Sequence, residues 1–452
     1  MSAGRLVMPT RILLVGSGAR EHALAWKLSG EPGVNTVYVA PGTDAMAAEP
    51  RVQRLPDVDP LDGASVVAAA RAVAAELVVI GPEAPLAAGV ADALEVAGIA
   101  VFGPTIDAAR IEASKAFCHE IARAAGVPMA RAGAFTSTRE AGLFARELAG
   151  DGRGIVVKAD GLAAGKGVTV CETLDEAIAA IETSARAGMI VVEERLIGPE
   201  ASLIALCDGR DALALPIARD HKRLGDGDTG PNTGGMGAYS PLPDLPDDAA
   251  DGLIARFHRP ILAELARRGT PFRGALYAGL MLTADGPVLL ECNARFGDPE
   301  TQAIVPRLAA ALGPLLLAAA HGRLLEAARP LGIQGTRLPV LPITTVGVVL
   351  AASGYPDTPR RGDEIAGIDR ATAGGALVFH GGTAREDHGG TAARGDGAYR
   401  TAGGRILTVV GRGPDHAAAR AVAESAADLI TFDGLQRRHD IGADAVPVGA
   451  AS

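Results

Sequence analysis

Residues 11–28 read RILLVGSGAREHALAWKL and decide the fold class of the first part of the chain. The apolar run Arg11–Val15 is typical of a buried strand, and Glu21–Leu28 has the pattern of a helix. The glycine-rich turn Gly16–Gly18 connects them. Because the following segments again alternate short apolar runs with helical patterns, we expect a parallel α/β sheet here.

Working outward from this stretch, the same alternation continues to about residue 102. We expect strands over Thr36–Ala40, Leu77–Ile80 and Ile99–Phe102, and helices over Val66–Glu76 and Leu86–Ala97. Loops at the carboxyl ends of such strands line a crevice in which open α/β sheets bind ligands. The loops at Gly16–Gly18, Pro41-Gly42, Gly81–Glu83 and Gly103-Pro104 should therefore lie near a binding site.

From Ser114 onward the pattern changes, and strands and helices mix. The expected elements are a helix over Lys115–Ala125, strands over Ile155–Lys158, Val168–Cys171, Ile190–Glu193, Thr344–Ala351 and Arg405–Val410, and a last helix over His416–Ile430. Pro339 and Pro342 mark a boundary before the last segment. A length of 452 residues also suggests about three domains.

Composition excludes several classes of protein. A net charge of −10 and an aromatic content of 3% weigh against a nucleic-acid surface. The longest apolar run, Leu308–Ala320, contains Pro314 and is too short to span a bilayer, and Met1–Thr10 does not resemble a signal peptide. Four widely spaced cysteines fit a reducing cytoplasm. The 58 glycines fit either a compositional bias or backbone that approaches ligands closely.

The turn Gly16–Gly18 precedes a helix, where free N–H groups attract phosphate. Two details oppose a nicotinamide dinucleotide site. Glu21 replaces the third glycine of the fingerprint, and the second strand ends at Pro41-Gly42 without an acidic residue for the ribose. An anion-binding turn and a tight turn with nothing bound both remain open.

The segment KADGLAAGKG, residues 158–167, is a stronger phosphate signal. It is not a Walker A loop, because Gly161 and Gly165 stand too close together and Gly167 replaces the Ser or Thr. Lys158 and Lys166 nevertheless place two ammonium groups beside amides that can approach polyphosphate. A hairpin with solvated lysines explains four glycines and two lysines less well.

Two further segments are candidates for binding. The strand end Glu193–Leu196, with Glu200 close behind, could present a backbone edge to a nucleobase and a carboxylate to a ribose. The segment from Asp220 to Gly237 is dense in polar residues and glycine, so its order should depend on ligands and hydrogen bonds. We favour a binding loop over a disordered surface loop there.

The segment from Leu289 to Glu300, LLECNARFGDPE, is the sharpest signal. In a strand Glu291 and Asn293 share one face, and carboxylate and amide oxygens suit Mg²⁺ that carries phosphates. Arg295 adds a fork for carboxylate or phosphate. The alternative is a polar strand end with a structural Arg–Asp pair. The nine histidines show no metal-ligand spacing.

Several stretches together resemble a known family. They are GSGAREHALAWKL, GPEAPLAAGV, FGPT, SKAF, KADGLAAGKGV, DHKRLGDGDTGPNTGGMGAYSP, YAGLM, ECNARFGDPETQ, SGYP, FHGGT, GGRIL and RRHDIG. The chain resembles the phosphoribosylamine–glycine ligases of the ATP-grasp superfamily from Arg11 to Gly442. The resemblance implies an N-terminal α/β domain over residues 1–112 and a two-lobed ATP-grasp core over 113–335, with its smaller lobe at about 128–200. A small C-terminal α/β domain should cover 336–452.

The resemblance also implies a reaction and a set of roles. ATP would activate glycine as glycyl phosphate, and 5-phosphoribosylamine would attack it, in the second step of purine synthesis. The nucleotide residues would be Lys115, Lys158, Lys166, Glu193, Glu194, Leu196 and Glu200. The ligands of Mg²⁺ or Mn²⁺ would be Glu291 and Asn293, and the catalytic residues Arg295 and Asp298. The substrate residues would be Gly16, Ser17, Gly18, Glu83, Asp220, Lys222, Asn232, Thr233, Gly234, Gly235, Met236 and Gly237. We expect a cytoplasmic monomer without nucleic-acid or membrane partners.

The sequence departs from the family pattern at three places. The stretch 185–189 is shorter than in relatives, which bears on a flap over the phosphates. A polar loop at 385–398 is enlarged, and residues before Met8 fall outside the match, so that Met8 is an alternative start.

Three alternatives to the ligase were weighed. They are an ATP-grasp ligase with another acyl acceptor, a nicotinamide oxidoreductase and an inactive ATP-binding module. The intact block Asp220–Pro241 opposes the first, and the missing third glycine and ribose acid oppose the second. The third would need the loss of a metal ligand or a lysine, and none is lost.

Overall fold

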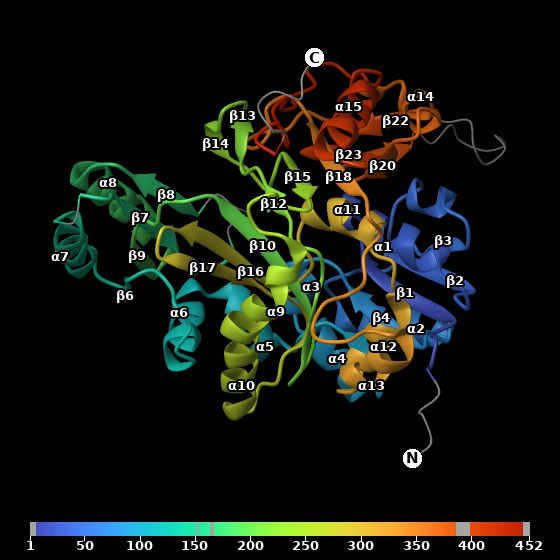
Figure 1. Cartoon of the computed structure of the whole chain (residues 1–452), viewed down its shortest axis with the longest axis horizontal. Helices are drawn as coiled ribbons and strands as arrows, with labels where there is room; N and C mark the ends of the chain where they lie inside the picture. The colour runs from blue at the N-terminus through green and yellow to red at the C-terminus, as the bar shows by residue number, and fades with distance from the viewer. Residues whose placement is uncertain (1–5, 151, 163–166, 386–397, 446–452) are drawn as a thin grey trace.

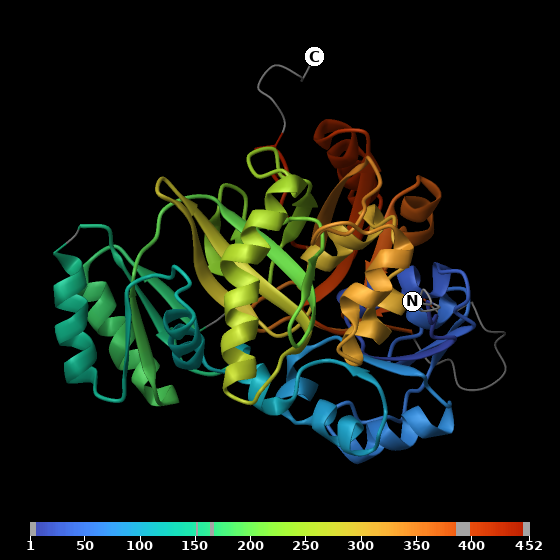
Figure 2. The same ribbon diagram turned by 60° about the horizontal axis from the view of Figure 1, so that its bottom comes forward.

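The computed structural model describes residues 6–150, 152–162, 167–385 and 398–445. Figure 1 shows a central antiparallel sheet with the N-terminal sheet on one side and a smaller lobe projecting on the opposite side. The C-terminal helices and strands lie above the N-terminal sheet in that view. Figure 2, turned by 60°, shows the same separation of the smaller lobe from the rest of the molecule. The mixed α/β class expected from the sequence is confirmed.

The N-terminal region is built on a five-stranded parallel sheet. Its strands are β1 (Arg11–Gly16), β2 (Thr36–Pro41), β3 (Val52–Arg54), β4 (Leu77–Ile80) and β5 (Val101–Phe102), in the order β3-β2-β1-β4-β5. The chain order reverses between β1 and β4, and the crevice of an open sheet forms at such a point. The loops after these two strands, at Gly16 and Gly81, therefore lie side by side.

Helices cover this sheet much as expected, with three differences. The helices are α1 (Ala19–Gly30), α2 (Gly63–Ala72), α3 (Glu83–Ala87), α4 (Val90–Val96) and α5 (Ile106–Ala113), with a 3₁₀ turn η1 (Met46–Ala48). The single helix expected over Leu86–Ala97 is broken, because Gly89 adopts a φ of +79°. Helix α5 was not predicted. The short strand β3 was not predicted, since three residues carry too little pattern.

The smaller lobe is an antiparallel sheet with its own apolar core. Its strands are β6 (Ala132–Phe135), β7 (Ile155–Ala159), β8 (Val168–Cys171) and β9 (Ile190–Glu194), in the order β6-β9-β7-β8. Its helices are α7 (Thr138–Ala149) and α8 (Leu174–Ser184), followed by a 3₁₀ turn η2 (Ala185–Ala187), and α6 (Lys115–Ala124) precedes it. The short stretch at 185–189 therefore consists of little more than this turn.

The central sheet belongs to the larger lobe. Its strands are β10 (Glu200–Asp208), β11 (Ala212–Ala214), β16 (Arg273–Thr283) and β17 (Gly286–Asn293), in the order β11-β10-β16-β17. The surrounding helices are α9 (Ala250–Leu253), a π-helical segment η4 (Ile254–His258), α10 (Arg259–Arg267), α11 (Glu300–Ile304), α12 (Gly313–Ala320) and α13 (Leu324–Ala328). Short 3₁₀ turns are η3 (Asp247–Ala249), η5 (Val305–Arg307) and η6 (Arg329–Leu331).

The C-terminal sheet draws strands from two distant parts of the chain. Strands β18 (Thr344–Ala351), β20 (Leu377–His380) and β23 (Arg405–Gly413) join β12 (Arg219–Asp220) and β15 (Gly237–Ser240), in the order β12-β15-β18-β23-β20. Gly237 pairs with Val348, and a Cβ at Gly237 would meet the Gly347 carbonyl oxygen at 2.6 Å. The segment from Asp220 to Pro241 thus links the larger lobe to the C-terminal sheet.

The remaining elements complete the C-terminal region and the linking segment. They are the hairpin of β13 (Arg223–Gly225) and β14 (Thr229–Asn232), a small sheet of β19 (Glu364–Ile365), β22 (Tyr399–Thr401) and β21 (Thr383–Arg385), and helices α14 (Ile368–Ala373) and α15 (His416–Ala427). Among the described residues no helix is long and apolar enough to cross a membrane. The polar loop expected at 385–398 lies largely outside the described residues.

Candidate active site

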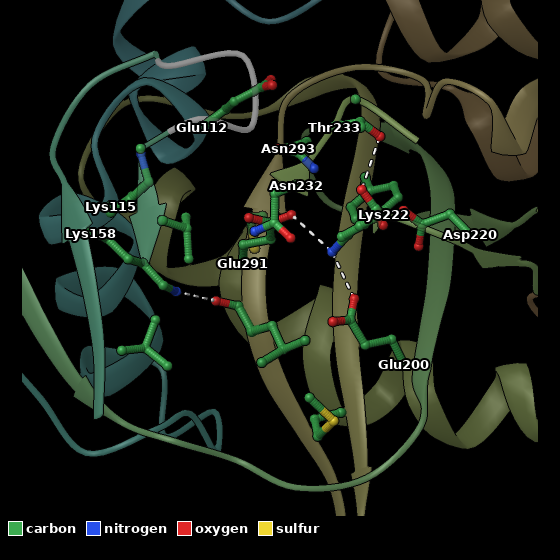
Figure 3. Close-up of a pocket in the computed structure, with 18 of the residues that line it drawn as sticks. Glu112, Lys115, Lys158, Glu200, Asp220, Lys222, Asn232, Thr233, Glu291 and Asn293 are labelled. Carbon is green, nitrogen blue, oxygen red and sulfur yellow. Dashed lines mark hydrogen bonds and ion pairs between the residues drawn. The ribbon is translucent and has the colours of Figure 1, made fainter. Parts of the chain in front are cut away.

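A large cavity lies where the smaller lobe, the larger lobe, the N-terminal region and the C-terminal region meet. Its volume is about 1050 Å³. Figure 3 shows that its walls carry Lys115 and Lys158 on one side and Glu200, Asp220 and Lys222 on the other, with Glu291 between them. Segments far apart in the sequence therefore supply one site.

The end of β7 places Lys158 against the end of β9. Lys158 Nζ lies 2.8 Å from Glu193 Oε2, and His119 Nε2 lies 2.7 Å from Glu193 Oε1. Burial by itself would lower the pKa of Lys158, but the Glu193 carboxylate overrides it and raises the pKa. Both side chains are buried, so the ammonium is held charged in the cavity wall.

Lys115 stands at the first turn of α6, where the glycine-rich turn after β7 meets it. The Asp160 carboxylate accepts hydrogen bonds from the Lys115 backbone N–H at 2.6 Å and from Ser114 Oγ at 3.0 Å, so that it caps α6. Lys115 Nζ donates to the Gly161 carbonyl oxygen at 2.8 Å. Burial lowers the pKa of Lys115, while Glu291 opposes that shift. Lys166 lies outside the described residues.

Beside these cations the cavity has an apolar slot. Glu194, Leu196 and Glu200, expected at a nucleotide, all line the cavity. The Glu194 carboxylate accepts a hydrogen bond from the Arg131 backbone N–H at 2.8 Å and is turned toward β6. The apolar side chains that line the cavity include Val156, Val170, Ile197, Met281 and Leu290. Such a slot suits the faces of a flat base.

Glu291 and Asn293 end β17, and both line the cavity from one face of the strand, as the alternation predicts. Burial would raise the pKa of Glu291, but Lys222 and Lys158 lower it below its usual range. The Glu291 carboxylate is thus ionised, and 37% of its side chain is exposed to the cavity. Within the described residues no three His, Cys, Asp or Glu side chains converge on one point.

Lys222 bridges carboxylates on the opposite wall. Its Nζ lies 2.7 Å from Glu200 Oε2 and 3.8 Å from Glu291 Oε1, as the dashed lines in Figure 3 mark. Burial raises the pKa of Asp220 to about 8, although Lys222 opposes that shift. Thr233 Oγ1 donates to the Lys222 carbonyl oxygen at 2.9 Å and so fixes the turn after β14.

Asp298 and Gly234 meet at an arginine from the C-terminal region. Arg405 Nη2 donates to Asp298 Oδ2 at 2.9 Å, and Arg405 Nη1 donates to the Asp298 and Gly234 carbonyl oxygens. The Gly234 N–H donates to the Tyr355 hydroxyl at 2.9 Å. Burial would raise the pKa of Asp298, but Arg405 holds it below its usual range. The C-terminal region therefore supplies part of the site.

Arg295 faces acids of the N-terminal region. Its Nε lies 3.2 Å from Glu112 Oε1 and 3.4 Å from Glu83 Oε2. The Glu112 carboxylate also accepts a hydrogen bond from the Ala294 N–H at 2.7 Å. Glu83 further lies 4.0 Å from Arg20 Nη1. Burial would raise the pKa of Glu83, and the two guanidinium groups lower it.

The N-terminal turn, which the family resemblance implies at the substrate, is bonded to a side chain of the protein itself. Gly16, Ser17 and Gly18 are absent from the residues that line the cavity. The Gly18 N–H donates to Glu21 Oε2 at 2.7 Å, and Arg20 Nε donates to Glu21 Oε1 at 2.5 Å. Cβ atoms added at Gly16 and Gly81 would lie within 2.6 Å of the Glu21 side chain. The Glu21 carboxylate thus accepts the hydrogen bond of the Gly18 N–H, a group that could otherwise bind a phosphate.

Of the loop residues expected at the substrate, Asn232, Thr233 and Gly234 line the cavity, and Gly235, Met236 and Gly237 do not. Met236 is fully buried, and Gly237 belongs to β15. Gly235 has a φ of +109°, and a Cβ there would meet Pro299 at 2.4 Å. Met236 and Gly237 thus hold the loop against the C-terminal sheet, and Gly235 lies against Pro299.

Sequence reasoning missed several polar residues of the cavity wall. They are Arg20, Glu112, His119, Glu300, Tyr355 and Arg405. Glu300 is buried and accepts a hydrogen bond from Ser202 Oγ at 3.1 Å. Most of these residues lie in or beside stretches that carry the family resemblance, such as SGYP and GGRIL, but only the fold brings them together. Glu112 and His119 flank the SKAF stretch without belonging to a motif.

Comparison with known families identifies this arrangement in two steps. Residues 113–301 match the family described as phosphoribosylglycinamide synthetase, ATP-grasp (A) domain, so the fold and the cavity are those of an ATP-grasp enzyme. Residues 10–112 and 345–444 match the N domain and the C domain of the same synthetase. The chain therefore belongs to the phosphoribosylglycinamide synthetase family.

Curated relatives and solved structures agree with this assignment. A phosphoribosylamine–glycine ligase of Streptomyces coelicolor is 48% identical over 96% of this chain and 99% of its own length. One of Ralstonia nicotianae is 44% identical over the same shares. The crystal structure of a phosphoribosylamine–glycine ligase from Thermotoga maritima is 32% identical, covers 95% of this chain and 100% of its own, and has a TM-score of 0.76.

A more distant structure shares only the fold. The biotin carboxylase domain of a 2-oxoglutarate carboxylase from Hydrogenobacter thermophilus is 16% identical, with a TM-score of 0.64 over 95% of this chain and 92% of its own. The two-lobed core is therefore common to enzymes whose sequences have diverged widely.

Proposed function

We propose that the protein is an ATP-dependent carboxylate–amine ligase that joins glycine to 5-phosphoribosylamine. The products are glycinamide ribonucleotide, ADP and phosphate, in the second step of de novo purine synthesis. One observation carries the proposal: a single cavity runs from the lysines of the smaller lobe to the Arg–Asp cluster at the N- and C-terminal regions. Relatives named phosphoribosylamine–glycine ligase support it over 96% of the chain.

The chemistry explains why one cavity must hold three substrates. A carboxylate is a poor electrophile, so an oxygen of the glycine carboxylate first takes the γ-phosphoryl group of ATP, which releases ADP and forms glycyl phosphate. The amine nitrogen of phosphoribosylamine then attacks the carbonyl carbon, loses a proton and expels phosphate. The protein contributes position and charge neutralisation, as phosphoryl transfer generally requires.

The nucleotide is proposed to lie between the lobes. Lys115 and Lys158 face the ATP phosphates, and Lys166, which lies outside the described residues, is proposed to join them. The base occupies the apolar slot along Glu193, Glu194 and Leu196, and Glu200 meets the ribose. The salt bridge from Lys158 to Glu193 supports this arrangement, because it holds the ammonium charged and oriented before ATP arrives.

Glu291 and Asn293 are proposed to hold Mg²⁺ or Mn²⁺. Their hard oxygens suit such an ion, and the lowered pKa of Glu291 keeps its carboxylate ionised. When bound, the ion would neutralise charge on the ATP phosphates. Two protein ligands are enough for Mg²⁺, which usually completes its shell with phosphates and water.

The acceptor half of the cavity is proposed to bind glycine and phosphoribosylamine. Arg295 and Asp298 lie beside glycine and its acyl phosphate, and Asp220 and Lys222 line the path between them and the nucleotide. Glu83, Asn232, Thr233 and Gly234 contact phosphoribosylamine. Gly235, Met236 and Gly237 fix that loop from behind, and the turn Gly16–Gly18, which the resemblance implies at phosphoribosylamine, is bonded to the Glu21 carboxylate.

Two further parts of the proposal concern the protein in the cell. We propose a cytoplasmic monomer, a location that fits four buried cysteines without a disulfide among the described residues. Size-exclusion chromatography with light scattering tests the oligomeric state.

The ligase activity has a direct test. Purified protein should form ADP only when glycine and phosphoribosylamine are both present. Equal ADP formation without glycine would refute the ligase function. Because phosphoribosylamine is labile, complementation of a purine auxotroph that lacks this step is the matching experiment in cells.

A further inference from the structure

The hairpin β13–β14 forms a wall of the cavity but has almost no apolar core. Between Arg223 and Asn232 only Leu224 and Pro231 are apolar, and residues 226–231 are all exposed. Arg223, Asp228 and Asn232 of the hairpin nevertheless line the cavity. Something other than hydrophobic burial must therefore hold this wall in place.

A segment more than 200 residues later supplies that hold. Arg438 is the bulkiest fully buried side chain of the described residues, with 1% of it exposed. Its Nη1 donates to Asp228 Oδ1 at 2.6 Å and to the Arg223 carbonyl oxygen at 3.2 Å. Its Nε and Nη2 donate to the two carboxylate oxygens of Asp440, each at 2.7 Å. One guanidinium thus joins the hairpin to the C-terminal segment.

The link is made from both directions. The Gly227 N–H donates to Asp440 Oδ2 at 2.8 Å, and the His439 N–H donates to Asp226 Oδ1 at 2.7 Å. The tip of the hairpin, residues 226–228, is therefore bonded by the segment 438–440. In Figure 1 the hairpin stands beside the C-terminal part of the chain and above the central sheet.

We propose that Arg438 is a positioning residue for the acceptor half of the site: by fixing the hairpin β13–β14, it sets the affinity for phosphoribosylamine. This inference rests on the proposed function for the identity of that ligand. Arg438 touches no substrate in this arrangement and acts through Asp228, Arg223 and the turn that follows β14. A small displacement of a binding wall weakens binding strongly. Loss of Arg438 should therefore lower the affinity for phosphoribosylamine and leave the affinity for ATP nearly unchanged.

The adjacent arginine provides a matched control. Arg437 belongs to the same segment, and 9% of its side chain is exposed. It pairs with Glu424 and Asp428 at α15, and its Nε donates to His439 Nε2 at 3.3 Å, so it touches the hairpin only through His439. Loss of Arg437 should therefore loosen the contact with α15 and leave in place the bonds that Arg438 makes to Asp228 and Arg223.

The first measurement is hydrogen exchange on the full chain. In Arg438→Met, backbone amides of residues 225–232 should exchange about tenfold faster or more, since Gly227 and the hairpin ladder lose their support. In Arg437→Met they should exchange as in the parent. Equal protection of the hairpin in the parent and in Arg438→Met would overturn the proposal, as would equal losses in both variants. This readout is independent of any ligase activity.

The second measurement is steady-state kinetics. Arg438→Met should raise KM for phosphoribosylamine about tenfold and change KM for ATP less than about twofold. The KM of Arg438→Lys for phosphoribosylamine should lie between those of the parent and of Arg438→Met. An ammonium keeps the charge but cannot bond to Asp228 and to both oxygens of Asp440 as the guanidinium does. Equal increases in both KM values would refute a role confined to the acceptor. If neither the parent nor any variant shows ligase activity, the proposed function fails. The hydrogen-exchange result still decides whether Arg438 fixes the hairpin β13–β14.

A third variant guards against failure of Arg438→Met to fold. Asp228 is 68% exposed in its side chain, so Asp228→Asn should fold normally. It removes the same ion pair from the hairpin side and should loosen the hairpin in the same direction, to a smaller extent. Unchanged hydrogen exchange in a folded Asp228→Asn protein would show that the ion pair between Arg438 and Asp228 does not fix the hairpin.

Discussion

Two polar strand ends look alike in the sequence and differ in the structure. The turn after β1 carries glycines, Arg20 and Glu21, and the end of β17 carries Glu291, Asn293 and Arg295. At the first, the Glu21 carboxylate already accepts hydrogen bonds from Arg20 and from the Gly18 N–H. At the second, Glu291 is surrounded by lysines at longer range and keeps 37% of its side chain exposed to the cavity.

The difference teaches that a glycine-rich turn or a carboxylate is a site only when its polar groups remain available. The hydrogen bond from the Gly18 N–H to Glu21 occupies one of the donors that a phosphate would need. The lysines around Glu291 instead lower its pKa and leave its oxygens facing the cavity. Four predictions test this contrast, and they run from the largest expected effect to the smallest.

Removing the charge at the open strand end should have the largest effect. Glu291→Gln should lower turnover by more than about 100-fold, because the loss of a proposed metal ligand costs more activity than the loss of a residue that only orients a ligand. Titration with Mn²⁺, followed by its paramagnetic signal, should show weaker binding. Asp285→Asn, on the exposed turn before β17, is the matched control and should keep full activity. Full activity of Glu291→Gln would remove it from the metal site.

Removing the charge of Lys158, which lies beside the end of β17, should affect both stability and ATP binding. Lys158→Met leaves the buried Glu193 carboxylate without its ammonium partner, which should cost about 3–5 kcal/mol of the free energy of unfolding. Urea denaturation measures that loss. Lys158→Met combined with Glu193→Gln should regain most of the stability without regaining ATP affinity. Recovery of both would show that Lys158 is only a structural partner.

Opening the closed turn should affect stability alone. Glu21→Ala removes the acceptor of the Gly18 N–H and the partner of Arg20, at a cost of about 1–3 kcal/mol in the free energy of unfolding. KM for phosphoribosylamine should change less than about twofold. Thermal unfolding and initial rates measure the two quantities. A large rise in KM for phosphoribosylamine would show that the turn binds this substrate, as the family resemblance implies.

The effect that is smallest at neutral pH concerns the contact of α1 with the C-terminal region. The His380 N–H donates to His22 Nδ1 at 2.9 Å, and burial, with His22 and Arg385, lowers the pKa of His380 to about 3. Below pH 6.5 the unfolded chain binds a proton at His380 that the folded chain does not. The free energy of unfolding should therefore fall by about 1.4 kcal/mol per pH unit between pH 6 and 4 from this residue.

Denaturation of the parent and of His380→Gln across this pH range isolates that contribution. The slopes of the free energy of unfolding against pH should differ between the two proteins by about 1.4 kcal/mol per pH unit, which corresponds to one proton. Parallel slopes would mean that His380 is protonated equally in the folded and unfolded states.

Much of the fold and part of the site followed from local pattern. The strand Thr344–Ala351 was predicted with the bounds that the structure has, because eight consecutive buried residues leave a clear signal. The shared face of Glu291 and Asn293 followed from strand alternation alone. The split of one helix at Gly89 was missed, since glycine inside a helical pattern does not reveal its φ.

The rest depends on contacts between distant segments. Neither Arg405 beside Asp298 nor Glu112 beside Arg295 can be read from spacing, because 107 residues separate the first pair in sequence and the second joins two regions. The closed state of the Gly16–Gly18 turn was also out of reach. Its outcome depends on the rotamer of Glu21, which packs against Gly16 and Gly81 from the neighbouring strand end.

The sharing of the C-terminal sheet has a consequence for how the chain is assembled. During synthesis β15 emerges well before β18, the strand with which it pairs from Gly237 to Ser240. Until then β15 is an uncovered edge, and such edges recruit other chains. The segment Asp220–Pro241 therefore reaches its final shape only after the last third of the chain has been made. A protein severed between residues 335 and 344 would keep Lys115, Lys158, Glu291 and Asn293 yet expose this edge, and we expect it to aggregate.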